Sequence, residues 1–266
     1  MKKFLSTAVV FIVCFVASAQ ESKGKSKDKD DERREKMNAL KKQAEEGVLV
    51  FNKQNIFGLQ LRTNGYGIFY EVGKMKSNRK TNIYRIDITE VKNHKEEKIP
   101  AGGVVFGNPY IYGKQNNFYQ LTLGFGQQFM LGQKGNKNGV AVSMIYNGGL
   151  ALGFLRPYYL EIQDPVTGQN KYIRYTEEDS ALFLNNAVII GGAGLSKGWG
   201  DIKVTPGVFG KFAFRFDYGR FNEVISGIEL GISAEYYTDH MPVLLLQEEK
   251  QLYFQAYIAV LFGRRK

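Results

Sequence analysis

Apolar residues at every second position, over segments of ten residues or more, constrain this chain more than any other feature. Between Leu252 and Phe262 every even-numbered residue is apolar, and the residues between them are mixed. Because successive side chains of a strand point to opposite faces, such a segment predicts a strand with one apolar face. The same alternation recurs in residues 57–61, 66–70, 82–91, 119–125, 208–218 and 224–236.

The length of these segments separates two kinds of β-protein. Strands of a soluble sandwich or barrel also alternate, but about 5 or 6 residues are enough for them. A tilted strand that crosses a bilayer needs roughly 9 to 11 residues, which these segments match. No run of 18 apolar residues follows residue 20, so we expect no membrane helix. The pattern therefore favours an all-β, membrane-spanning, antiparallel up-and-down barrel over a soluble barrel.

The connections between the segments support this fold. We assume that the last strand ends in the periplasm and count the connections back from it. Those at 239–250, 155–204 and 92–116 are then expected on the outer side of the membrane, and those at 219–223, 132–138 and 73–81 on the periplasmic side. The long ones all fall outside, as in bacterial barrels, whose strand number is even. This count gives only seven strands.

A hidden hairpin supplies an eighth strand. Phe57, Leu59 and Leu61 occupy odd positions, whereas the apolar residues of 66–70 occupy even ones. Asn64-Gly65 lies between them, and Asn-Gly is the strongest short hairpin signal. We therefore predict two strands here and eight strands in all, while one bulged strand is the alternative that would make the strand number odd.

The N-terminus predicts export. Lys2 and Lys3 precede an apolar run from Phe4 to Val16, and small residues follow, so we expect a signal peptide over 1–19. A membrane anchor is the alternative, but thirteen residues reach only about two thirds of the hydrocarbon layer. Cys14 is the one cysteine, so the mature chain is expected to have neither disulfides nor thiolate metal sites.

Residues 20–46 form a charge-dense stretch without aromatic residues, which we interpret as a periplasmic tail that is either a spacer or a docking segment. Residues 47–266 are then the outer-membrane barrel. The formal net charge of the chain is +10. In an exported chain this excess favours contact with outer-membrane lipid, lipopolysaccharide or acidic glycans rather than nucleic acid.

Charged residues alternate with the apolar ones and are expected to face the lumen. This predicted lumen charge network comprises Arg62, Arg85, Asp87, Lys211, Arg215, Asp217, Glu229 and Glu235. An eight-stranded barrel has room for side chains but not for a wide channel, so paired charges should fill the space. An ion-conducting path is the functional alternative.

Signals for chemistry are weak. His94 and His240 are the two histidines, and Asp239-His240 has the residue types of an acid–base pair, but no nucleophile or third group accompanies it. The glycine-rich segment 191–198 lacks the spacing of a phosphate-binding loop. We therefore expect no enzyme activity, no cofactor and no metal site.

The segment 155–204 is too long for a simple connection, so we expect it to cap the barrel or to form a recognition surface. Its composition is helix-like at 177–186. The candidate recognition residues are Trp199, which is the only tryptophan, together with Lys197, Arg156 and Tyr158.

Several framework segments carry a resemblance. These are FGLQLRTNGYGIFYEVGK (57–74), YNGGLALGFLRPYYL (146–160), GLSKG (194–198) and the closing LYFQAYIAVLFGRRK. In them the chain resembles small outer-membrane β-barrels of Bacteroidota, most of which have long external loops and no assigned activity. The basic end after Phe262 departs from the usual aromatic terminus of such barrels.

The leading hypothesis is a structural or partner-binding role at the outer membrane, with protein partners bound through the external loops and the N-terminal tail. An accessory subunit of a secretion or assembly complex would fit this description. A narrow pore or transporter for small solutes is the second hypothesis, and an envelope enzyme acting near His240 is the third.

Overall fold

The computed structural model describes residues 34, 38, 51–100, 108–135, 138–220 and 223–266. Eight long antiparallel strands close into a barrel, in the ring order β1-β13-β12-β11-β7-β6-β3-β2. The barrel strands are β1 (Lys53–Arg62), β2 (Gly65–Ser77), β3 (Lys80–Val91), β6 (Asn116–Gly132), β7 (Ala141–Pro157), β11 (Lys203–Asp217), β12 (Val224–Met241) and β13 (Lys250–Arg265). The prediction of an eight-stranded up-and-down barrel is confirmed.

The predicted hairpin is confirmed as well, although Thr63 and Asn64 form its turn and Gly65 begins β2. Arg62 of β1 pairs with Gly65 of β2, so two residues connect the strands and the bulged-strand alternative is wrong. The ring then closes where β1 pairs with β13, with Phe57 opposite Phe262. A closed ring leaves no edge strand, as a barrel in lipid requires.

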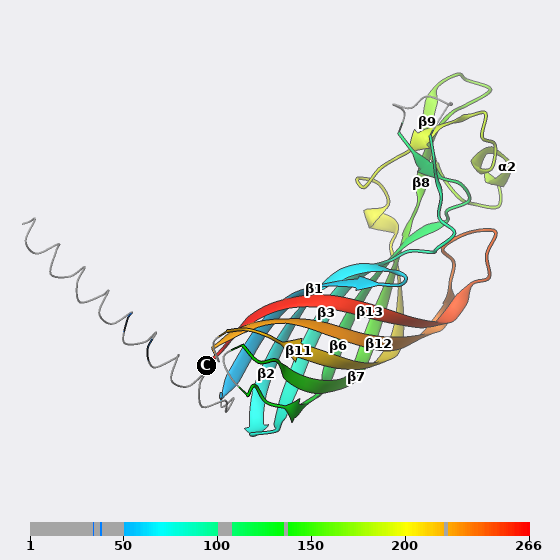
Figure 1. Cartoon of the computed structure of the whole chain (residues 1–266). Helices are drawn as coiled ribbons and strands as arrows, with labels where there is room; N and C mark the ends of the chain where they lie inside the picture. Colours follow the sequence, from blue (N-terminus) through cyan, green and yellow to red (C-terminus); the bar gives the residue numbers. More distant parts are fainter. Residues whose placement is uncertain (1–33, 35–37, 39–50, 101–107, 136–137, 221–222) are drawn as a thin grey trace, which may run out of the picture.

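The connections divide the barrel into two unlike ends. We call the end with the connections 78–79, 133–140 and 218–223 the turn end, and the opposite end the loop end. The predicted turn at 73–81 is too long, because the β2–β3 ladder continues to the pair Ser77 and Lys80. The C-terminus lies at the turn end (Figure 1).

The predicted external segment 155–204 is slightly too long at both margins. Strand β7 runs to Pro157 and β11 begins at Lys203. Between them lies a small sheet with the order β10-β8-β9. Its strands are β8 (Tyr159–Gln163), β9 (Asn170–Arg174) and β10 (Ile189–Gly192).

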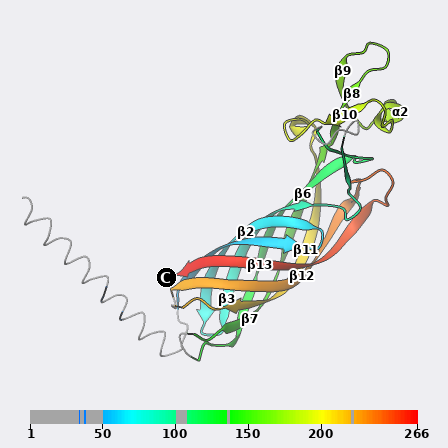
Figure 2. The same ribbon diagram turned by 45° about the horizontal axis from the view of Figure 1, so that its top comes forward.

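Two short helices and a second ladder complete the loop end. The helix expected at 177–186 is reduced to α2 (Ser180–Phe183), and a 3-10 helix covers Trp199–Asp201. The segment before β6 holds the ladder of β4 (Lys98–Ile99) and β5 (Tyr110–Ile111). We call residues 158–202 together with 108–115 the cap; it stands above the loop end of the barrel (Figures 1 and 2).

The cap has an apolar core of its own. Its buried members come from β5, β8, β9, α2 and β10 and are Tyr110, Leu160, Ile162, Ile173, Phe183 and Ile189. The Tyr110 hydroxyl donates to Asn186 Oδ1 at 3.0 Å, and the Tyr112 hydroxyl donates to the Leu184 carbonyl at 3.2 Å. The cap is therefore a packed unit rather than an open loop.

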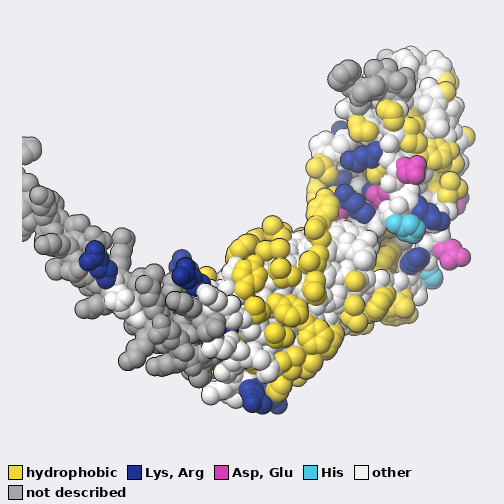
Figure 3. All heavy atoms as spheres, viewed as in Figure 1, with side chains coloured by type: hydrophobic (Ala, Val, Ile, Leu, Met, Phe, Trp, Pro, Cys, Tyr) yellow, Lys and Arg dark blue, Asp and Glu magenta, His cyan; other side chains and the backbone are white. Residues whose placement is uncertain are grey.

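The barrel shows its apolar side to the outside. Phe57, Leu59 and Leu61 are each about half exposed or more, and corresponding residues on the other seven strands are exposed too. On the face seen in Figure 3, hydrophobic side chains cover the middle of the barrel, while charged side chains lie toward its ends. Soluble proteins rarely expose so large an apolar surface, and the hydrocarbon layer of a bilayer would cover it. Among the described residues no helix is long and apolar enough to cross a membrane.

Candidate functional site

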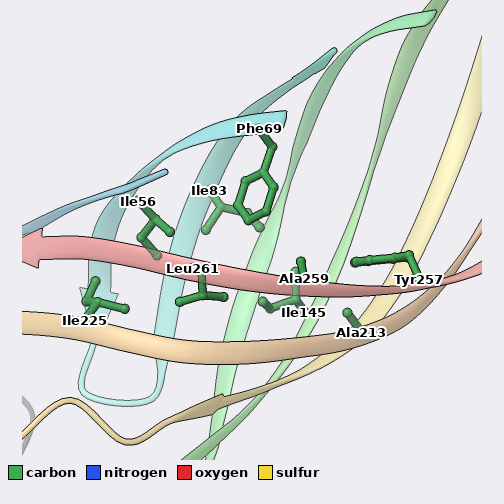
Figure 4. Close-up of a cluster of buried hydrophobic side chains, with 9 residues drawn as sticks. All are labelled: Ile56, Phe69, Ile83, Ile145, Ala213, Ile225, Tyr257, Ala259 and Leu261. Carbon is green, nitrogen blue, oxygen red and sulfur yellow. The ribbon is translucent and has the colours of Figure 1, made fainter. Parts of the chain in front are cut away.

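The lumen holds two apolar clusters and a network of charged side chains. Near the turn end lies an apolar cluster of side chains from seven strands, which gather inside the barrel (Figure 4). Its members are Ile56, Phe69, Ile83, Ile145, Ala213, Ile225, Tyr257, Ala259 and Leu261. Charged side chains contact this cluster, because Arg85 lies over the Phe69 ring and the Tyr257 hydroxyl donates to Glu229. A second apolar cluster, near the loop end, includes Phe118, Phe209 and Tyr237. Among the described residues these side chains fill an interior that has no room for a wide channel.

All eight residues of the predicted charge network are buried inside the barrel. Arg85 of β3 lies 2.7 Å from Glu229 of β12 and 3.1 Å from Asp87. Lys211 of β11 lies 2.9 Å from Asp87. Strands β3 and β12 are four positions apart in the eight-membered ring, so the Arg85–Glu229 pair joins opposite walls.

A second ion pair, next to Arg85–Glu229, also crosses the barrel. Arg215 of β11 donates from two nitrogens to Glu71 of β2, at 2.8 and 2.7 Å, and β2 lies opposite β11 in the ring. Arg215 also lies 2.7 Å from Glu229. Such bidentate, charge-assisted contacts are stronger and more directional than neutral hydrogen bonds. Glu229 of the first pair thus contacts Arg215 of the second, and the two crossing pairs form one continuous network.

The remaining predicted charges lie toward the two ends. Arg62 lies 2.6 Å from Glu235 and also donates to Gln120. At the turn end, Asp217 lies 3.4 Å from Lys134 and 2.5 Å from Arg265. The basic C-terminal extension thus continues β13 and contributes one lumen ion pair.

Sequence reasoning missed three members of this network: Glu71, Lys134 and Arg265. Glu71 could have been found, because it follows Tyr70 in a strand whose even residues face outward, so its odd position faces the lumen. Lys134 lies in the β6–β7 connection and has no periodicity to place it. Arg265 lies at the very end of the last strand, beyond the segment whose alternation was read.

The four predicted recognition residues do not form one exposed surface. Arg156 is buried at the junction of β7 and the cap, and its guanidinium carbon lies 4.9 Å from the centre of the Trp199 ring and 5.6 Å from that of Tyr119. Trp199 and Tyr119 are stacked at 6.0 Å. Trp199 Nε1 and Arg156 Nη1 both donate to the Leu195 carbonyl, at 2.6 and 2.8 Å.

Tyr158 and Lys197 lie apart from that stack. The Tyr158 hydroxyl accepts a hydrogen bond from the Ile111 amide, and burial raises the pKa of this hydroxyl above its usual value. The Lys197 ammonium is exposed and lies 4.8 Å from the centre of the Tyr172 ring. Arg156, Tyr158 and Tyr172 border a cavity of about 670 Å³ between the cap and the barrel rim.

A buried ion pair lines the same cavity. Lys114 Nζ lies 2.8 Å from Glu96, and both side chains are nearly inaccessible. Removal from water lowers the pKa of Lys114 from its usual value, although the Glu96 carboxylate acts in the opposite direction. These two residues come from the segment before β6 and were not among the predicted site residues.

The histidines do not assemble a reactive site. His240 is exposed on β12 with its Nδ1 3.3 Å from Gln251 Nε2, and His94 borders a separate cavity of about 330 Å³. Within the described ranges, no three His, Cys, Asp or Glu residues are grouped closely enough to hold a metal ion. The predicted signal peptide over 1–19 lies outside the described residues, as does the predicted tail over 20–46 apart from Arg34 and Asn38.

Comparison with known proteins yields structural likeness alone. A scan of protein-family models and a search of curated proteins give no match. The crystal structure of Neisserial surface protein A aligns with a TM-score of 0.39 and 8% identity, covering 81% of this chain and 97% of that one. The Yersinia pestis attachment invasion locus protein Ail aligns at 0.35 and 9%, covering 81% and 99%. The N-terminal β-barrel domain of Pseudomonas aeruginosa OprF aligns at 0.35 and 9%, covering 80% and 98%.

At these scores the likeness supports no functional conclusion, and the membrane assignment rests on the barrel itself. Eight antiparallel strands close without an edge, apolar side chains surround them, and short turns at one end contrast with long connections at the other. Only helices and closed barrels satisfy every backbone polar group in lipid. The chain has the architecture of an outer-membrane β-barrel.

Proposed function

We propose that this protein has a structural, partner-binding role in which a plugged barrel anchors the cap at the outer surface of the outer membrane. The observation that carries the proposal is the pair of ion pairs, Arg85–Glu229 and Arg215–Glu71, that cross the lumen between opposite strands. They occupy the space a solute would need. The cap, in contrast, adds a packed surface and a cavity on the side where bacterial barrels place their long loops.

The finer parts of the proposal extend the same reasoning. Protein partners would contact the cap and the N-terminal tail, and the protein would serve as an accessory subunit of an envelope secretion or assembly complex. The framework segments that resemble small barrels of Bacteroidota fit this type of protein. The role is not enzymatic in this proposal, and the pore hypothesis has no support beyond lumen charges that already pair with one another.

Cysteine labelling tests the orientation. The only cysteine, Cys14, lies in the predicted signal peptide, so a single introduced cysteine is a unique label. Val166→Cys places a thiol on the cap at a residue that is 91% exposed, and Asn78→Cys places one in the β2–β3 turn. A membrane-impermeant maleimide should label Val166→Cys on intact cells and Asn78→Cys only after the outer membrane is opened. The reverse pattern would refute the orientation.

The same two variants test partner binding. A cross-linker with a maleimide at one end and an amine-reactive succinimidyl ester at the other, applied to native membranes, should join Val166→Cys, and not Asn78→Cys, to lysines of a protein of defined mass. That species should be identified by mass spectrometry and should be recovered in repeated preparations. If several cap positions give no cross-linked species, the partner-binding role is refuted while the barrel and its orientation stand.

A further inference from the structure

Arg156 is a buried cation without a carboxylate partner among the described residues. Its side chain belongs to a residue that is 2% exposed, and no Asp or Glu lies within ion-pair distance of it. Nη1 donates to the Leu195 carbonyl at 2.8 Å, but Nε has no hydrogen-bond partner. Buried charges are ordinarily paired with an opposite charge, so this guanidinium lacks a counter-anion.

The aromatic neighbours of Arg156 do not replace that anion. The rings of Trp199 and Tyr119 attract the guanidinium through their faces, which offsets part of the cost of its burial. A ring face supplies no hydrogen-bond acceptor in the plane of the guanidinium, which is where carboxylates and phosphates bind. An oxyanion is the group that would satisfy both the charge and the free Nε–H.

The adjoining cavity is large enough to bring such an anion to Arg156. Its volume of about 670 Å³ lies within the range of small-molecule sites. Asn117 also borders it, is 8% exposed, and has an Nδ2 group without a hydrogen-bond partner. Lys92 and Lys98 add two cations at its margin. The site therefore presents two buried donors that no described protein group satisfies.

The acidic side chains around the cavity do not supply the missing anion. Glu96 is held by Lys114 at 2.8 Å, and Glu161 accepts a hydrogen bond from Asn170 Nδ2 at 3.1 Å. Glu90 accepts one from the Tyr66 hydroxyl at 2.5 Å and lies 3.9 Å from Lys92. Each carboxylate near the cavity thus has its own partner, whereas Arg156 has no carboxylate partner among the described residues.

We propose that this cavity binds an anionic sugar whose phosphate or carboxylate pairs with Arg156. The side chains of Tyr158 and Tyr172 border the cavity and can contact a sugar ring, and the amide of Asn117 can donate to its oxygens. This inference rests on the proposed function only in placing the cavity outside the cell. There the sugar would come either from lipopolysaccharide in the same membrane or from a soluble glycan.

Trp199 is the chain's only tryptophan and lies 4.9 Å from the guanidinium carbon of Arg156, so its fluorescence reports on the site. The purified full chain in detergent should be titrated with glucuronate, glucose 1-phosphate, neutral glucose, inorganic phosphate and lipopolysaccharide. The anionic sugars should shift the emission at concentrations at least about tenfold lower than glucose does, since a charge-assisted pair adds more than a factor of ten in affinity.

Three variants locate the binding. Arg156→Gln removes the charge and should weaken binding of the anionic sugars about tenfold or more. Lys98→Gln changes an exposed side chain, so folding is preserved, and should weaken binding about two- to fivefold. Arg79→Gln removes the same charge from the turn end and should leave binding unchanged. Heat-dependent migration in unboiled electrophoresis checks that each barrel is folded.

The outcomes discriminate clearly. Equal affinity for glucose and glucuronate would overturn the proposal, and so would unchanged affinity in both Arg156→Gln and Lys98→Gln. If inorganic phosphate binds as tightly as glucose 1-phosphate, the claim that the site recognises a sugar is refuted. Binding of lipopolysaccharide with no response to the soluble sugars assigns the source to the membrane, and the opposite result assigns it to a soluble glycan. Labelling that places the cap inside would refute the proposed function and leave sugar binding intact.

Discussion

Arg85 of β3 and Glu229 of β12 lie on opposite walls of the barrel, with Nη1 and Oε1 2.7 Å apart. The two residues are 144 positions apart in the sequence. The Tyr257 hydroxyl also donates to Glu229 at 2.7 Å, and the Arg85 guanidinium stacks 3.6 Å above the centre of the Phe69 ring. One ion pair thus connects β2, β3, β12 and β13 through the lumen.

Breaking this pair should destabilise the barrel strongly. Glu229→Gln keeps the shape of the side chain but leaves Arg85 and Arg215 with less opposite charge, and removing one partner of a buried pair costs about 3 kcal/mol or more. The urea midpoint of unfolding in detergent or lipid measures the loss. The control is Asp239→Asn, which removes an exposed pair with Lys203 and should cost less than about 1 kcal/mol. Equal, small losses would contradict the structural role of Glu229.

The plugged lumen should carry no current. Purified wild-type protein in planar bilayers should give no single-channel steps, because the crossing pairs and both apolar clusters occupy the interior. The double variant Glu71→Ala with Arg215→Ala removes one crossing pair and should raise the frequency of brief openings. Regular steps from the wild-type protein would refute the plug and revive the pore hypothesis.

Gly58 should tolerate no side chain. A Cβ at this position would overlap the Phe69 ring, which is buried beneath the Arg85 guanidinium. Gly58→Ala should therefore displace Phe69 and cost about 1 to 3 kcal/mol. Gly210→Ala is the matched control, because no heavy atom lies within 4 Å of its added Cβ. Thermal unfolding monitored by electrophoretic mobility compares the two, and an equal effect would contradict the packing of Phe69.

Lys114 should make the loop end more stable as pH rises. Desolvation lowers its pKa in the folded protein, so the unfolded chain binds more protons between that lowered value and the ordinary lysine pKa of about 10.4. Stability therefore rises with pH across this interval. Relative to Lys114→Met, the wild type should gain urea resistance as the pH rises toward the ordinary lysine pKa of about 10.4. A difference that stays constant over this range would contradict the predicted titration.

Much of the barrel was predictable because a strand between lipid and lumen needs a period of two. The phase change between Leu61 and Tyr66 located the hairpin, and alternation alone placed Arg85, Arg215 and Glu229 inside. The exact ends of strands were less predictable. The β2–β3 ladder continues through polar residues to Ser77, where the hydrophobic pattern has already stopped.

The fold of the cap could not be predicted from the periodicity of apolar residues. Its strands are five residues long or less. Residues from both sides of the undescribed segment 101–107 pack together in its core. Arg156 illustrates the difficulty, since a charged residue in a long connection is ordinarily solvated. It is buried here because β7 extends to Pro157 and the Trp199 segment folds back over it.

The sequence by itself determined that this chain forms eight strands with an apolar exterior and a charged interior, because the alternation of side chains is a local property of each strand. The tertiary structure alone decided which charges meet. The pairing of Arg85 with Glu229, of Arg215 with Glu71 and the isolation of Arg156 depend on how the ring closes and how the cap folds over it. Those contacts join residues distant in the chain, and no local pattern encodes their distances.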